Sequence, residues 1–129
     1  MNHAIIAQSD IPMKVLISPS AEDLESFFKD AVWVVDALVG TGQKGSLRTP
    51  LDLVVRQINE SGVKVLAVDL PSGLDADTGI ASDPTIKATI TATMVTPKIG
   101  FQNPEAQAYL GKLKVVGIGL PKCYVPLKK

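Results

Sequence analysis

The sequence predicts an α/β fold in which helices lie on both faces of a mostly parallel sheet, and three observations support this prediction. Short apolar runs that end in Gly, Pro or Asp alternate with amphipathic stretches, as strands alternate with helices in this fold class. The runs 31–40 and 63–70 are almost continuously apolar, which is typical of parallel strands covered on both faces. The 129 residues contain no internal repeat or linker, so we expect a single domain over 1–129.

The N-terminal half of the sequence predicts two strands and two helices. The β-rich run 13–18 is expected to form a short strand, and a helix is expected over 21–29 because acidic residues suit the first turn of a helix. The run 31–40 is expected at the centre of the sheet because it is apolar along almost its whole length. A second helix is expected from Leu51 until Gly62, since glycine is favoured just after a last helical turn.

The C-terminal half predicts three strands and one short helix. The buried strand 63–70 is broken by a Pro-Ser-Gly turn. The threonine-rich segment 87–95 alternates in the manner of a half-exposed or edge strand. A short helix is expected over 105–110 and a last strand over 113–120, while the tail 122–129 is expected to be peripheral.

The composition excludes several classes of function. Thirteen basic and thirteen acidic residues give a formal net charge of zero, so nothing indicates a nucleic-acid partner or an anionic membrane surface. No apolar run reaches the roughly 18 residues of a membrane span, and an apolar content of 46% is too high for a disordered chain. A single cysteine cannot form an intrachain disulfide, which fits a cytoplasmic protein, and a single histidine disfavours Ser/His/Asp hydrolysis.

Two predicted strands end in the same way, with an aspartate followed by a loop of small residues. Asp36 precedes Gly-Thr-Gly (40–42), and Asp69 precedes Pro-Ser-Gly (71–73). Ligands of open parallel sheets bind beyond the carboxyl ends of the strands, so we expect the two carboxylates to meet at one pocket. A buried carboxylate also needs a cation, a hydrogen-bond donor or a ligand, because its desolvation costs several kcal/mol.

The loop after Asp36 predicts a nucleotide-like ligand. Its glycines let the backbone approach an anion, and the helix that begins near Pro50 offers free amides to a phosphate. Lys98 follows a predicted strand and is either a phosphate contact or an ordinary surface lysine. A structural explanation stays open for each motif taken alone, because glycine-rich loops and Pro-Ser-Gly turns are common in α/β proteins.

Four segments carry a resemblance to a known family: DALVGTGQKGSLR (36–48), VLAVDLPSGLDADTG (65–79), KATITATMVTPKIGF (87–101) and VVGIGLP (115–121). In this order they resemble the YjeF N-terminal domain family, the NAD(P)H-hydrate epimerases, from about residue 2 to residue 121. The resemblance implies a Rossmann-like three-layer αβα sandwich. It also implies an isomerase that interconverts the R and S epimers of hydrated NADH and NADPH in nicotinamide nucleotide repair.

The resemblance further assigns roles to individual residues. Asp36 and Ser72 match the family's ligands of a potassium ion, a hard cation that prefers carboxylate and hydroxyl oxygens. Asp69 matches the aspartate that faces the damaged ring, so we expect it to bind the substrate and to act as the acid–base group. The matching substrate-binding loop consists of Gly40, Thr41, Gly42, Gln43, Lys44, Gly45 and Ser46.

The sequence also departs from the family pattern. The family domain starts with a strand and an Asn-Asn-Gly-Gly-Asp loop that no stretch of this sequence matches, and Ser46 replaces a common proline. We therefore expect a domain truncated at its N-terminus that lacks a central strand. Its exposed strand edge predicts self-association, for which a homodimer is the simplest form.

Three hypotheses for the function follow. The first is a catalytic NAD(P)H-hydrate epimerase. The second is a non-catalytic nucleotide-binding or protein-interaction module of the same fold, and the third is a mononucleotide-binding α/β domain of some other reaction. An Asn-Asn-Gly-Gly-Asp loop encoded upstream of Met1 would favour catalysis over the second hypothesis.

Overall fold

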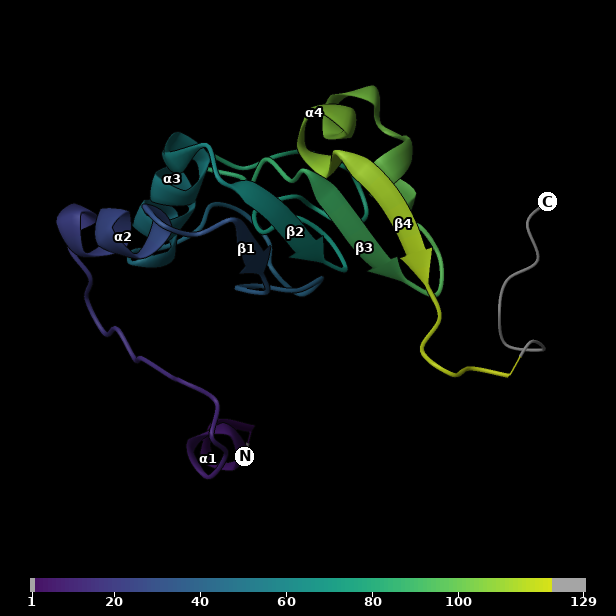
Figure 1. Cartoon of the computed structure of the whole chain (residues 1–129). Helices are drawn as coiled ribbons and strands as arrows, with labels where there is room; N and C mark the ends of the chain where they lie inside the picture. The colour runs from purple at the N-terminus through teal and green to yellow at the C-terminus, as the bar shows by residue number, and fades with distance from the viewer. Residues whose placement is uncertain (1, 122–129) are drawn as a thin grey trace.

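Four parallel strands in the order β1-β2-β3-β4 form a single sheet in the computed structural model, which describes residues 2–121 (Figure 1). Each strand pairs in parallel with its neighbour, and Asp36, Ala67, Thr91 and Leu113 lie side by side across the sheet. This arrangement confirms the predicted α/β class and mostly parallel sheet. The strands are β1 (Trp33–Asp36), β2 (Lys64–Val68), β3 (Ile90–Met94) and β4 (Lys112–Val116).

The helices begin and end where their sequences favour it. Ser20 caps α2 in a capping box, because its side chain accepts from the Asp23 amide at 3.1 Å and its amide donates to the Asp23 carboxylate at 3.0 Å. The helix α3 ends at Gly62, which has a left-handed φ of 68°. The helices are α1 (Asn2–Ala7), α2 (Ala21–Phe28), α3 (Leu51–Ser61) and α4 (Gln107–Leu110), with 3₁₀ turns at Ile99–Gln102 and Pro104–Ala106 before α4.

The strand order corrects three predictions. Segment 13–18 is not a strand but an exposed stretch before α2, because no strand of the described chain pairs with it. The predicted parallel pairing of β1 with β2 is confirmed, but β1 is an edge strand and not the centre of the sheet. Of the two alternatives for β3, the edge strand is wrong because β3 lies between β2 and β4, whereas the half-exposed strand is confirmed by its alternating burial.

Threonine is accommodated inside the sheet because its hydroxyl finds an acceptor there. Thr91 is fully buried, and its hydroxyl donates to the Leu110 carbonyl at 2.7 Å at the end of α4. A buried hydroxyl that makes a hydrogen bond avoids the cost of desolvation. The alternation of threonine in β3 therefore reflects satisfied polar groups on a buried face.

The core lies on one face of the sheet. Val65 packs against Val55 and Ile58 of α3, and Leu113 packs against the cluster that contains Leu110 of α4. The strand register places Val34, Val65, Ala67, Thr91 and Leu113 on this same face. Helices α3 and α4 thus share one side of the sheet and form one helical layer.

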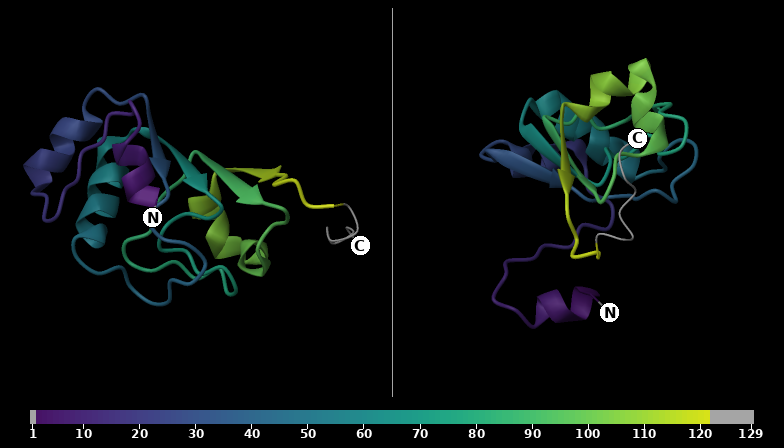
Figure 2. Two further views of the ribbon diagram at one scale, coloured as in Figure 1. Left: turned by 90° about the horizontal axis from the view of Figure 1, so that it is seen from below. Right: turned by 90° about the vertical axis from the view of Figure 1, so that its right-hand side faces the viewer.

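The opposite face of the sheet, which we call the open face, has no helix in front of it in the described residues (Figure 1). Trp33, Val35, Met94 and Val116 lie on it with 36–60% of their surface exposed. The helix α1 lies apart from the sheet (Figure 2). The second helical layer of the expected sandwich is therefore not among residues 2–121, and the predicted exposed strand edge is found at β1.

The tail 122–129, expected to be peripheral, lies outside the described residues. No helix within residues 2–121 has the length and apolar character needed to cross a membrane.

Candidate functional site

Asp36 and Ser72 form a buried polar pair at the carboxyl ends of β1 and β2. Both residues are only 1% exposed, and the Ser72 hydroxyl donates to Asp36 Oδ1 at 2.6 Å. The Ser72 amide donates to Oδ2 at 2.8 Å, and the Leu38 amide donates to Oδ1 at 3.3 Å. In turn the Ser72 hydroxyl accepts from the Val39 amide at 3.2 Å. The topology therefore brings together two side chains that are 36 positions apart in the sequence.

The chemistry of this pair fits a hard monovalent cation. A carboxylate and a hydroxyl oxygen lie in contact, and no Lys, Arg or His of the described chain is within ion-pair distance of the Asp36 carboxylate. Hydrogen bonds alone balance its buried charge. Residues 2–121 contain no group of three or more His, Cys, Asp or Glu side chains that could hold a metal. A cation here would need carbonyl or water oxygens in addition to Asp36 and Ser72.

Asp69 forms a second polar centre just after β2. Its Oδ1 accepts from Lys98 Nζ at 2.6 Å, from the Met94 amide at 3.0 Å and from the Thr93 hydroxyl at 3.3 Å. Burial raises the pKa of Asp69, but the Lys98 ammonium and the Met94 amide outweigh burial, so the pKa lies below its ordinary value. Asp69 is therefore an ionised carboxylate at neutral pH. Asp36 ends β1 and Asp69 follows its parallel neighbour β2, so both aspartates lie at the carboxyl ends of adjacent strands, each with its own hydrogen-bond partners.

The backbone around Asp69 is strained. Asp69 has φ 71° and Val95 has φ 65°; this left-handed conformation is uncommon for any residue except Gly, is more frequent for Asp than for most others, and is a clear outlier for a β-branched residue such as Val. Such residues cost about 1–3 kcal/mol each and cluster at functional sites. The two strained residues end β2 and β3, and between them the Met94 amide meets the Asp69 carboxylate.

Residues of the predicted substrate-binding loop, Gly40–Ser46, line two hollows of the surface. Gln43, Gly45 and Ser46 line a hollow of about 310 Å³ together with residues of the segment 73–82. Thr41 lines a second hollow of about 460 Å³ together with Lys98. The loop thus contributes to both hollows, and the second one adjoins the ion pair between Lys98 and Asp69.

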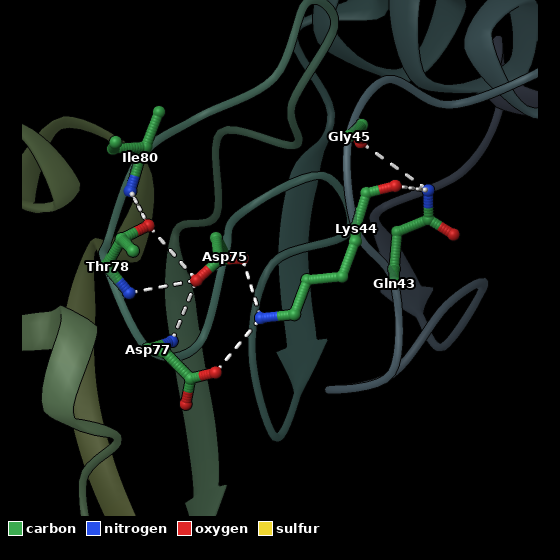
Figure 3. A network of polar contacts seen from close by, with 7 residues as sticks. All are labelled: Gln43, Lys44, Gly45, Asp75, Asp77, Thr78 and Ile80. Carbon is green, nitrogen blue, oxygen red and sulfur yellow. Dashed lines mark hydrogen bonds and ion pairs between the residues drawn. The ribbon is translucent and has the colours of Figure 1, made fainter.

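Lys44 connects the loop to the turn that follows β2. Its ammonium lies 2.9 Å from Oδ2 of Asp75 and 2.9 Å from Oδ2 of Asp77 (Figure 3). The sequence analysis did not predict this contact. It also treated Lys98 as a phosphate contact or a surface residue, although the structure pairs Lys98 with Asp69. The sequence held a signal for this ion pair, because Lys98 follows β3 and Asp69 follows β2, and these two strands are neighbours.

Comparison with known proteins places these features in a family. The model of the family described as YjeF-related protein N-terminus matches residues 2–100. An NAD(P)H-hydrate epimerase of Pirellula staleyi is 42% identical over 105 residues, which are 81% of this chain and 46% of that protein. A bifunctional NAD(P)H-hydrate repair enzyme Nnr of Coxiella burnetii is 40% identical over 108 residues, which are 84% of this chain and 22% of that protein.

A solved structure supports the fold. The crystal structure of yeast ynu0 superposes with a TM-score of 0.63 over 80% of this chain and 42% of that chain, at 24% identity. This likeness shows the fold alone. The chain spans less than half the length of each of these three proteins.

Proposed function

Because this chain belongs to the family of the YjeF-related protein N-terminus, we propose that it is the catalytic unit of an NAD(P)H-hydrate epimerase. Its substrates would be hydrated NADH and NADPH, NADHX and NADPHX, whose R and S epimers it would interconvert. The names of the relatives at 38–42% identity support this proposal. The observation that carries it in the structure is the ion pair between Asp69 and Lys98, which lies beside the substrate-binding loop.

Epimerisation at a hydroxylated ring carbon requires one carbon–oxygen bond to break and a new one to form on the other face. The ring nitrogen lone pair expels the hydroxyl, which leaves as water after it gains a proton. A water molecule then adds to the opposite face and loses a proton, so no net proton is consumed. In our proposal Lys98 supplies the first proton, and the Asp69 carboxylate accepts the proton of the incoming water. The proton then passes from Asp69 back to Lys98 across their ion pair, which restores both groups for the next turnover.

We propose that Asp36 and Ser72 hold a potassium ion. When bound, this ion would supply a positive charge at the carboxyl ends of β1 and β2 that attracts the phosphates of the dinucleotide. Asp36 would hold the ion through its carboxylate, and Ser72 through its hydroxyl oxygen. The support is the pairing of these oxygens in a buried place without a protein cation among the described residues.

We propose that the loop of Gly40, Thr41, Gly42, Gln43, Lys44, Gly45 and Ser46 contacts the dinucleotide. Gly40 and Gly42 leave open space where a side chain would stand, so a ligand can approach the backbone closely. The two hollows that the loop helps to line could receive separate parts of an elongated ligand.

The test is the conversion of one purified NADHX epimer into the other, followed chromatographically with this chain and with Asp69→Asn. The variant keeps the size of the side chain but removes the base, so we expect a loss of about 10²- to 10⁴-fold in rate. Dinucleotide binding should survive. If the unaltered chain binds NADHX but converts neither epimer, the second hypothesis of a non-catalytic module is correct. Near-normal conversion by the variant would assign the proton transfer to another group.

A further inference from the structure

The turn 75–79 after β2 is held rigidly by its own hydrogen bonds. Oδ1 of Asp75 accepts from the amides of Asp77 at 2.9 Å and Thr78 at 2.8 Å, and from the Thr78 hydroxyl at 3.0 Å. The Asp75 carbonyl accepts from the Gly79 amide at 2.9 Å. One carboxylate oxygen of Asp75 is thus fully used inside the turn, and the other faces outward (Figure 3).

The same turn is anchored to the body of the protein. Gly79 has φ 71°, and a Cβ there would clash with the Gly100 carbonyl, so the two backbones are in close contact. The Gly100 amide donates to the Ala76 carbonyl at 2.8 Å, and the Asn103 side chain donates to the Thr78 carbonyl at 3.0 Å. The turn is therefore a fixed support on the 3₁₀ turns that precede α4.

The loop 40–46, in contrast, has few contacts that would fix its conformation. The Gln43 amide donates to the Gly40 carbonyl at 3.1 Å, and the Gln43 side chain makes only long contacts, of 3.4 and 3.5 Å, within the loop. In the described structure, the hydrogen bonds that join this loop to the turn 75–79 both come from Lys44 (Figure 3). One side chain thus connects a loosely held loop to a rigid support.

The charges of Lys44, Asp75 and Asp77 favour the contact between the loop and the turn, but they stabilise it only weakly. One ammonium faces two carboxylates, which would repel each other in its absence. The hydrogen bonds to Asp75 and Asp77 raise the pKa of Lys44, and the Lys44 ammonium lowers the pKa of Asp75. The Lys44 side chain is 58% exposed, and exposed ion pairs are weak and screened by salt. We therefore expect salt to weaken the contact.

We infer that Lys44 is a positioning residue that holds the substrate-binding loop closed against the turn 75–79 before the dinucleotide binds. The loop is then already ordered when substrate arrives, so binding does not have to supply the full cost of ordering it. The effect of Lys44 on substrate binding rests on the proposed function. The closed conformation of the loop does not depend on it. Lys44 acts through the backbone of Gln43, Gly45 and Ser46, which line the first hollow.

The closed loop is tested by ¹⁵N relaxation of the Gly42 and Gly45 amides in this chain and in Lys44→Gln. Rigid backbone gives an order parameter of about 0.85, and a released loop gives less than about 0.6. We expect the order parameters to fall in Lys44→Gln and to stay partly or fully at the rigid value in Lys44→Arg. The control Lys29→Gln, which removes an exposed lysine elsewhere, should leave them unchanged. Sodium chloride at high concentration should reproduce the fall in the unaltered chain. Order parameters that stay the same in Lys44→Gln would overturn the inference.

Epimerase kinetics test the consequence for substrate. We expect Lys44→Gln to raise KM by about two- to fivefold, the range that exposed ion pairs give, with a smaller effect on kcat. A fall in kcat at constant KM would overturn the positioning role, because it would indicate contact with the transition state. If the unaltered chain converts no epimer but the order parameters still fall, the proposed function fails and the closed loop stands.

Discussion

The Asp69 carboxylate depends on Lys98 for its low pKa, and this dependence sets the pH range over which it can act as a base. Because the folded-state pKa lies below the ordinary value, the ion pair stabilises the folded chain above the pKa of the unfolded chain. This contribution is lost as the pH falls through the folded-state pKa. Asp69 therefore stays ionised throughout the neutral range.

Lys98→Met should raise the pKa of Asp69, because burial then opposes ionisation with only the Met94 amide and the Thr93 hydroxyl to offset it. The ¹³C chemical shift of the Asp69 carboxyl group, followed as a function of pH, measures this change without an activity assay. In an active protein the same variant should also convert the epimers more slowly at every pH, because Lys98 supplies the first proton in the proposed mechanism. An unchanged carboxyl titration would mean that Lys98 has no part in holding Asp69 ionised.

Asp36→Asn should destabilise the chain by about 1.5–3 kcal/mol. The buried Asp36 carboxylate accepts hydrogen bonds at both oxygens, and in Asn one of these oxygens becomes an amide nitrogen that cannot accept. Urea unfolding measures the loss. Asp83→Asn is the matched control, since Asp83 is exposed in a surface ion pair with Arg56 and should change stability by less than about 1 kcal/mol.

The same variant tests the potassium proposal. At equal ionic strength, potassium should raise the melting temperature of the unaltered chain above its value in sodium, because a ligand that binds only the folded state stabilises it. In Asp36→Asn the two salts should give the same melting temperature. A potassium effect that survives the substitution would place the cation elsewhere.

Among the elements, the turn 75–79 shows how a close backbone contact fixes a loop. Gly79→Ala should destabilise the chain by about 2 kcal/mol or more, because a Cβ meets the Gly100 carbonyl and the left-handed φ disfavours alanine. Gly42→Ala is the control, since Gly42 has open space around it and no positive φ. Urea unfolding of both variants decides the point, and equal stabilities would mean that the 3₁₀ turn moves aside at little cost.

The elements that the sequence predicts correctly are those whose signals are local. The acidic first turn of α2, the stop at Gly62 and the apolar runs of β1 and β2 each act through neighbouring residues or through strand pairing alone. The position of a strand within the sheet is not a local property. Val35 is apolar but exposed, and Thr91 is polar but buried, so the apolar pattern wrongly placed β1 at the centre and wrongly allowed an edge position for β3.

The candidate site could be predicted in part for the same reason. Asp36 and Asp69 follow apolar runs, and the topology of parallel strands predicts that such residues lie at one edge of a sheet. The partners that control their chemistry are distant in the sequence. Lys98 is far from Asp69 along the chain, and Lys44 is 31 positions from Asp75, so these ion pairs emerge only from the folded structure.

For the whole molecule, the open face and the free edge of β1 predict self-association. Parallel sheets are almost always covered on both faces, and a second copy of this chain is the partner that we expect to cover this one, as a homodimer. Val35→Lys places a charge on the open face and should shift the chain toward monomer in sedimentation velocity. Ile80→Lys, at a similarly exposed apolar residue away from the sheet, should leave the association unchanged.

A chain that sediments as a monomer at high concentration would contradict this prediction. Equal effects of Val35→Lys and Ile80→Lys would show that association depends on general hydrophobicity and not on the open face. The melting temperature provides a second readout, because it rises with protein concentration when the folded copies associate.

The left-handed backbone at Asp69 and Val95 has a consequence for how the protein can be improved. A residue held at positive φ costs stability, and glycine at Val95 would remove most of that cost because it has no Cβ. The same change would release the chain next to Met94, whose amide fixes the Asp69 carboxylate. Stability and a precisely aimed carboxylate are therefore in competition at the ends of β2 and β3. Selection for thermal stability alone would be expected to erode the arrangement on which the proposed chemistry depends.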